Sequence, residues 1–305
     1  MRFEAVKAIY QAALADPTIH FLTGDLGHAH ADDFRTNRPD NYHNTGIAEQ
    51  NMIGIASGLA LSGAKTFVYS IIPFITLRCL EQIKVDVCYQ NTDVTIIGVG
   101  QGFAYGPYGG THYSIEDISC LRALPHMKIV CPATPHETKI LTQEIISRGG
   151  PSYIRLGRGG EKDLTTEYPV AYGKGSVVRA GEDISIIAAG PIITEALGAA
   201  DALQEQGITA EVISMHTIKP IDGDLLRKRA AVRKGIFTLE EHNTLGGLGS
   251  AVAEVIMEAS QRPPIFKIFG VPDQWPKTVG SQEYLRDLFG LSAGKLAAAI
   301  LSLLK

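Results

Sequence analysis

Residues 46–63 read "GIAEQNMIGIASGLALSG" and place one carboxylate at the head of an apolar helix. If the stretch is helical, Ile53, Ala56 and Ala60 follow Glu49 at spacings of four, seven and eleven residues, which is one stripe of a helix. An ionised carboxylate buried there without a partner would cost several kcal/mol, so we expect either that water reaches Glu49 or that something binds it. The alternative is a first-turn glutamate that only complements the helix dipole, for about 0.3 to 1 kcal/mol.

The composition is that of a globular protein long enough for two domains. Of 305 residues, 45% are hydrophobic and 20% are charged. Lys and Arg number 28 against 32 Asp and Glu, a net charge of −4, and no long basic run is present, which disfavours nucleic acid and anionic membranes as partners. We find no targeting signal and no unbroken apolar run of about 18 residues, so no membrane span is expected.

The cysteines indicate a reducing environment. None of them forms a CxxC pair, and each lies in an apolar segment, so neither a disulfide framework nor a zinc site is indicated: Cys79, Cys88, Cys120 and Cys131. A cytoplasmic location fits this pattern best.

Short β-branched runs alternate with helical segments along the whole chain. Such runs begin at residues 20, 66, 94, 128 and 152 in the first half and at 184, 210, 235 and 266 in the second. Strands alternating with helices predict an α/β protein with mainly parallel sheets covered on both faces. Residues 157–175, rich in glycine and charge, read as a linker, and we predict two domains, 1–168 and 169–305.

In sheets of this kind, ligands bind at the carboxyl ends of the strands. The segment after the third predicted strand, residues 100–117, reads "GQGFAYGPYGGTHYSIED" and surrounds His112 with glycines. Glycine allows a ligand or a neighbouring chain to approach the backbone closely, although a surface loop would show the same composition.

Five motifs in this order resemble the pyrimidine-binding and C-terminal domains of the transketolase family, and in particular the C-terminal subunit of a split transketolase. The motifs occupy residues 46–63, 67–87, 106–137, 151–160 and 239–255, and the similarity runs from about residue 2 to the end.

The resemblance supplies a partner for Glu49, namely thiamine diphosphate. The family's glutamate at this position hydrogen-bonds the ring nitrogen of the aminopyrimidine and favours the imino form that removes the thiazolium proton. Phe74 matches the aromatic residue that stacks on the pyrimidine. Ile71 lies where transketolases often carry a further aromatic residue of the cofactor pocket, and Asp25 in "TGDL" matches an acid near the cofactor.

Three further positions match substrate contacts of the family. His112 matches a histidine near the donor's hydroxyls and the cofactor, where it can move a proton near neutral pH. Arg158 matches the arginine that holds the acceptor's phosphate, although Arg155 on the same stretch could be confused with it. Arg2 matches another phosphate contact.

A part of the family's site is missing from the sequence. The family holds the diphosphate and its divalent metal with a GDG motif, whereas this chain reads "GDL" at residues 24–26 and contains no GDG. The resemblance therefore implies a complementary N-terminal subunit that carries the metal, Mg or Ca, in an α2β2 assembly. It implies transfer of a two-carbon ketol unit between a ketose and an aldose, with phosphorylated sugars expected. The alternatives are the β subunit of a 2-oxo acid dehydrogenase and a non-catalytic structural subunit.

Overall fold

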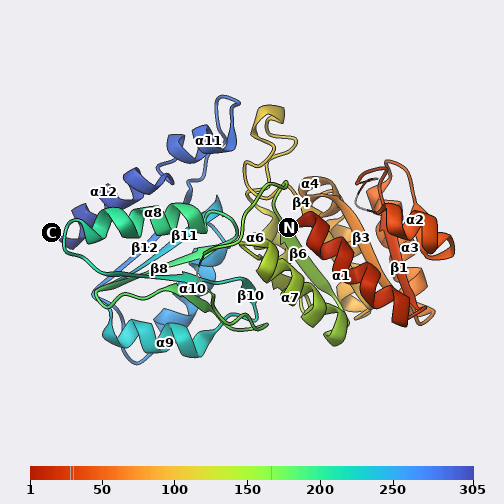
Figure 1. Ribbon diagram of the computed structural model, residues 1–305, viewed down its shortest axis with the longest axis horizontal. Coiled ribbons are helices and arrows are strands. Elements are labelled where there is room, and N and C mark those ends of the chain that lie inside the picture. Colours follow the sequence, from red (N-terminus) through yellow and green to blue (C-terminus); the bar gives the residue numbers. More distant parts are fainter. Residues whose placement is uncertain (28, 30, 166) are drawn as a thin grey trace.

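The computed structural model describes residues 1–27, 29, 31–165 and 167–305. The chain forms two sheets side by side, of seven and five strands, with helices on both faces of each (Figure 1). All but two of the strand pairings are parallel. The predicted α/β class with mainly parallel sheets is confirmed.

The first sheet has the strand order β10-β5-β6-β4-β3-β1-β2. Its strands are β1 (Ile19–Thr23), β2 (Tyr42–Asn44), β3 (Lys65–Ile71), β4 (Val94–Val99), β5 (Lys128–Val130), β6 (Ser152–Leu156) and β10 (Thr217–Lys219). Every residue of β4 and β6 is buried, as expected for central strands of a sheet that is covered on both faces.

Helices cover the two faces of this sheet. They are α1 (Arg2–Ala15), α2 (Asp32–Asn37), α3 (Glu49–Leu61), α4 (Ile72–Ile75), α5 (Leu80–Gln82), α6 (Asp117–Arg122) and α7 (Pro135–Arg148), with a π-helix, η3, at Ile83–Tyr89. Helices α1 and α7 share one apolar cluster with the sheet, and α3 belongs to the cluster on the other face. Helix α7 begins where the hydroxyl of Thr134 accepts the backbone N–H of Glu137 and Pro135 takes the first helical position.

The second sheet has the order β12-β11-β8-β9-β7. Its strands are β7 (Ser176–Arg179), β8 (Ile184–Ala189), β9 (Ala210–Ser214), β11 (Gly235–Asn243) and β12 (Ile265–Val271). Helices α8 (Ile193–Gln204) and α12 (Ala293–Leu304) pack on one face, and α9 (Gly223–Val232) and α10 (Leu248–Glu258) on the other (Figure 1).

Strand β10 comes from the second half of the chain but belongs to the first sheet. It lies between β9 and α9 in the sequence, yet it pairs antiparallel with β5 and completes the edge of the first sheet. The predicted boundary after residue 168 lies between β6 and β7, and as a domain boundary it stays a prediction.

One segment within the described residues, Gln282–Leu304, is long and apolar enough to cross a membrane by length and composition. Polar residues interrupt the segment, so it contains no unbroken apolar run of about 18 residues. The structure divides it into α11 (Gln282–Leu288) and α12, and α12 buries Leu296, Ala297 and Ile300 in the cluster shared with α8.

Candidate active site

Five of the residues that the sequence singled out lie in or after the carboxyl ends of four neighbouring strands. Because β1, β3, β4 and β6 are parallel and adjacent, the segments that follow them lie along one edge of the sheet. Asp25 follows β1, Ile71 ends β3 and Phe74 comes just after it, His112 lies in the loop after β4, and Arg158 follows β6.

Glu49 is the first residue of α3, and its side chain is only 2% exposed. Ser70 of β3 donates its hydroxyl to Oε1 at 3.2 Å, and Arg78 donates Nη1 to Oε2 at 2.7 Å. Gly24 closes over the acid, since a Cβ there would lie 3.5 Å from Oε1. The predicted stripe is confirmed, since Ile53 and Ala56 are buried and Ala60 is partly buried.

Arg78, which sequence reasoning missed, lies on the turn between α4 and α5 with 44% of its side chain exposed. Besides its ion pair with Glu49, the guanidinium carbon lies 4.5 Å from the centre of the Phe74 ring. The sequence contained one signal for this contact. Arg78 is a cation four residues after Phe74, and the predicted buried carboxylate of Glu49 needed a partner.

His112 belongs to an aromatic cluster beside Phe74. The two ring centres lie 5.2 Å apart in an edge-to-face arrangement, and Tyr105 and Tyr108 contact the same imidazole. Nδ1 lies 2.9 Å from the hydroxyl of Thr111. Burial lowers the pKa of His112, which favours the neutral imidazole at pH 7, with one ring nitrogen able to accept a proton.

Asp25 and Ile71 lie on the same edge of the sheet. Asp25 is exposed and left-handed, with φ of 59°, and Asn44 at the end of β2 holds it by donating Nδ2 to its Oδ1 at 2.9 Å. Ile71 is partly buried and immediately precedes α4. Their roles toward a cofactor stay predictions.

The two candidate phosphate contacts come from elements far apart in the sequence. Arg158 is exposed, touches the carbonyl of Ala104 at 3.5 Å and lines a cavity of about 330 Å³. Arg2, at the start of α1, lies against the next residue of the loop, since a Cβ at Gly159 would meet its Nη2 at 3.1 Å. Burial raises the pKa of Tyr105, which contacts His112, while the positive charges of Arg2 and Arg158 act in the opposite sense.

Arg155 is no alternative to Arg158. Its side chain is 1% exposed, and its Nε donates to Asp117 Oδ2 at 2.8 Å and its Nη1 to Gln101 Oε1 at 2.9 Å. Of the two arginines of the motif, Arg158 is the one exposed to solvent.

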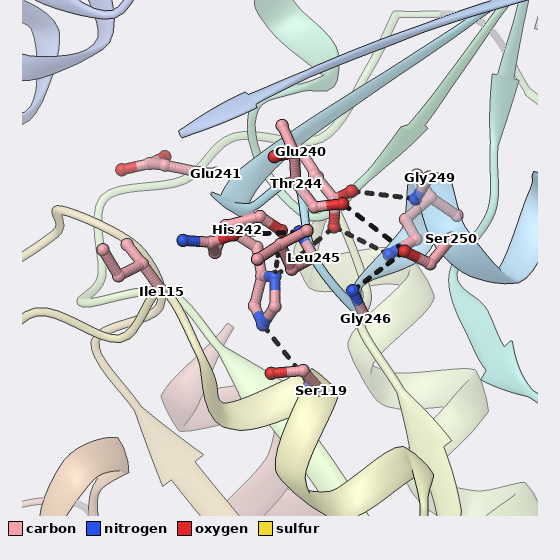
Figure 2. Close-up of polar contacts among 12 residues, drawn as sticks. Ile115, Ser119, Glu240, Glu241, His242, Thr244, Leu245, Gly246, Gly249 and Ser250 are labelled. Carbon is pink, nitrogen blue, oxygen red and sulfur yellow. Dashed lines mark hydrogen bonds and ion pairs between the residues drawn. The ribbon is translucent and has the colours of Figure 1, made fainter. Parts of the chain in front are cut away.

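A second polar cluster lies at the end of β11 (Figure 2). Glu240 accepts the backbone N–H groups of Leu248 and Gly249 at 2.7 and 2.8 Å, so the chain's own carboxylate occupies the start of α10. Burial raises the pKa of Glu240 to about 7 and lowers that of His242 to about 4. Among the described residues, no group of three or more His, Cys, Asp or Glu side chains is placed to hold a metal ion.

Two family models match the chain. The model described as transketolase, pyrimidine binding domain, covers residues 4–160, and the model described as transketolase, C-terminal domain, covers residues 173–296.

Named relatives match at similar length. An apulose-4-phosphate transketolase subunit of Phocaeicola vulgatus is 39% identical over 269 residues, covering 87% of this chain and 85% of that protein. The 6-deoxy-6-sulfo-D-fructose transketolase subunit SqwH of a Clostridium species is 35% identical over 301 residues, covering 98% and 92%. A solved structure described as a split gene transketolase, inactive beta4 tetramer, superposes with a TM-score of 0.87 at 34% identity, covering 99% of this chain and 96% of that one. The chain therefore belongs to the transketolase family and contains its pyrimidine-binding and C-terminal domains.

Proposed function

We propose that this chain is the C-terminal subunit of a two-chain, thiamine diphosphate-dependent transketolase that moves a two-carbon ketol unit from a ketose to an aldose. The observation that carries the proposal is the buried carboxylate of Glu49, which Arg78 connects to the ring of Phe74, with the ring of His112 edge-to-face against Phe74 at 5.2 Å. Family membership over almost the whole chain supports the same reaction class.

The residues around Glu49 suit the aminopyrimidine ring of thiamine diphosphate. The carboxylate is a buried hydrogen-bond acceptor, Phe74 offers a flat apolar face, and Gly24 has no side chain to fill the space above Oε1. The bound cofactor supplies the thiazolium carbon that carries the transferred unit. Glu49 would hold a proton at the ring nitrogen, Phe74 and Ile71 would orient the ring, and Asp25 would lie at the mouth of the site.

The remaining candidates serve the sugars in this proposal. His112 would take and return a proton at a sugar hydroxyl, in the neutral form that its lowered pKa favours. Arg158, and Arg2 beside the same loop, would grip the phosphate of the acceptor. A guanidinium fork matches that geometry, and the exposure of Arg158 leaves its donors accessible.

The assembly is part of the proposal. A complementary N-terminal subunit would hold the diphosphate and its divalent metal, Mg or Ca, in an α2β2 complex. The two relatives are named as subunits and the similar solved structure as a split gene transketolase, which supports a divided enzyme. The domain boundary at 168/169 and a cytoplasmic location belong to the same proposal, and the four free cysteines support a reducing compartment.

Reconstitution tests the proposal. We expect the purified chain alone to show no ketol transfer, and the chain mixed with its GDG-bearing partner, thiamine diphosphate and Mg²⁺ to show it. The donor panel should include apulose 4-phosphate and 6-deoxy-6-sulfo-D-fructose, for which two relatives are named. Activity of the chain alone would refute the divided enzyme. Oxidative decarboxylation of 2-oxo acids by the pair would favour the dehydrogenase alternative, and an inactive pair would favour a structural subunit.

A further inference from the structure

Arg78 contacts both side chains that bind the cofactor's pyrimidine ring in the proposed function, Glu49 and Phe74. Its Nη1 donates to Oε2 of Glu49 at 2.7 Å, and its guanidinium carbon lies over the ring of Phe74, 4.5 Å from the ring centre. A guanidinium is flat, donates hydrogen bonds and stacks on aromatic rings, which are also the properties of a protonated aminopyrimidine.

We propose that Arg78 is a built-in competitor of the cofactor: it satisfies Glu49 in the free subunit and must leave before the pyrimidine ring can bind. This inference rests on the proposed function, because it takes Glu49 and Phe74 as the pyrimidine site. The inference gives a role to Arg78, which has none in the proposed function. In the free chain, Arg78 would block the pyrimidine site.

The burial of Glu49 explains why its carboxylate needs a cationic partner when no cofactor is bound. The carboxylate is 2% exposed, and Ser70 supplies only one neutral donor, at 3.2 Å. Without a cation, the free chain would carry a buried and nearly unpaired charge, which is strongly destabilising. Arg78 therefore keeps the empty subunit folded, and cofactor binding exchanges one charge-assisted hydrogen bond for another.

The position of Arg78 allows it to leave. Its side chain is 44% exposed, and it lies on a turn rather than inside a regular helix. The turn joins two helical pieces of three and four residues, and the π-helix η3 follows directly. Rotation of the side chain into solvent would free Oε2 and one face of Phe74 without moving α3 or β3.

A first experiment tests the contact in the free chain. Free energies of unfolding are measured for Glu49→Gln, Arg78→Gln and the double variant, with Lys84→Gln as the control that removes one exposed charge from η3. We expect Arg78→Gln to lower the free energy of unfolding more than Lys84→Gln does. The decrease caused by Arg78→Gln should be smaller when residue 49 is already Gln. Additive effects would mean that the two side chains do not interact, and would overturn the inference.

The second experiment tests the competition. The dissociation constant of thiamine diphosphate is measured by calorimetry on the pair reconstituted with its partner and Mg²⁺. We expect Arg78→Gln to bind the cofactor roughly tenfold more tightly than the wild type, Arg78→Lys to fall between them because a lysine does not cover the ring as a plane, and Lys84→Gln to match the wild type. Association of the two subunits should stay unchanged.

The outcomes separate the two proposals. If the wild-type pair binds no cofactor, the proposed function fails and the inference with it. If the wild-type pair binds it and Arg78→Gln binds equally or more weakly, only the inference fails. A change confined to subunit association would make Arg78 an interface residue and would also overturn the competition.

Discussion

Nε of Arg155 lies 2.8 Å from Oδ2 of Asp117, and each side chain is only 1% exposed. Nη2 of the same guanidinium donates to the carbonyl oxygens of Ser114 in the first half of the chain and Glu241 in the second. A buried ion pair therefore stands at the junction of the two sheets. Removing one member of such a pair leaves the other charge buried without compensation.

We predict that Asp117→Asn lowers the free energy of unfolding by about 3 to 5 kcal/mol. The substitution keeps the shape of the side chain but leaves the positive charge of Arg155 without its counter-ion. Urea denaturation measures the effect. The control is Glu144→Gln, which breaks the exposed pair with Arg148 and should cost less than about 1 kcal/mol. Equal losses in the two variants would contradict the junction role.

Glu49→Gln should abolish cofactor activation while leaving assembly intact. The amide keeps the size of the side chain but cannot share a proton with the ring nitrogen, and loss of such assistance costs about 10² to 10⁴ in rate. Hydrogen–deuterium exchange at C2 of the cofactor in the reconstituted pair reports this step before any sugar binds. Glu81→Gln, an exposed acid of α5, is the control. Exchange at the wild-type rate would remove Glu49 from its proposed role.

Arg158→Ala should raise the KM of a phosphorylated acceptor with little change in cofactor affinity. A charge-assisted hydrogen bond of about 1.5 to 3 kcal/mol is at stake, which corresponds to roughly ten- to a hundredfold in KM. Steady-state kinetics with the acceptor and its unphosphorylated analogue measure it, and Arg227→Ala on α9 serves as the control. An unchanged KM would show that the acceptor's phosphate binds elsewhere.

The stability of the chain should depend on pH through Glu240, whose pKa burial raises from 4.5 to about 7. Between these values the folded chain binds more protons at this group than the unfolded chain does, so stability falls as pH rises. We predict that the free energy of unfolding of the wild type, relative to Glu240→Gln, decreases from about pH 5 to about pH 7 and then levels off.

Urea denaturation at a series of pH values measures this difference, with Glu258→Gln at the exposed end of α10 as the control. The lowered pKa of His242, whose Nδ1 lies 3.7 Å from Oε2 of Glu240, acts in the opposite sense in both proteins. A difference that rises with pH would mean that the N–H groups of Leu248 and Gly249 outweigh burial and keep the carboxylate ionised.

The sequence was sufficient for the class of fold and for the buried helical stripe behind Glu49, whereas the roles of the site residues stay predictions. Helical spacing identified the buried stripe behind Glu49, and strand alternation predicted the parallel sheets. Because parallel strands end at one edge, the segments that follow them lie along that edge, and the rings of Phe74 and His112 lie 5.2 Å apart there.

The features that escaped prediction all depend on contacts between distant segments. The pairing of Arg78 with Glu49 spans 29 residues and requires the turn after α4 to face the start of α3. The burial of Arg155 depends on Asp117 and on the approach of the second sheet, whereas strand alternation alone could not separate it from Arg158. The sequence between β9 and α9 carries no sign that β10 joins a different sheet.

The pairing of β10 with β5 bears on any attempt to recombine this chain with its relatives. A chimaera joined in the linker near residue 168 would exchange the edge strand of the sheet that it was meant to keep. A fragment ending there would leave the outer N–H and C=O groups of β5 unpaired, an edge that invites aggregation. A chimaera should therefore take residues 217–219 and residues 128–130 from the same parent, so that both paired strands have matching sequences.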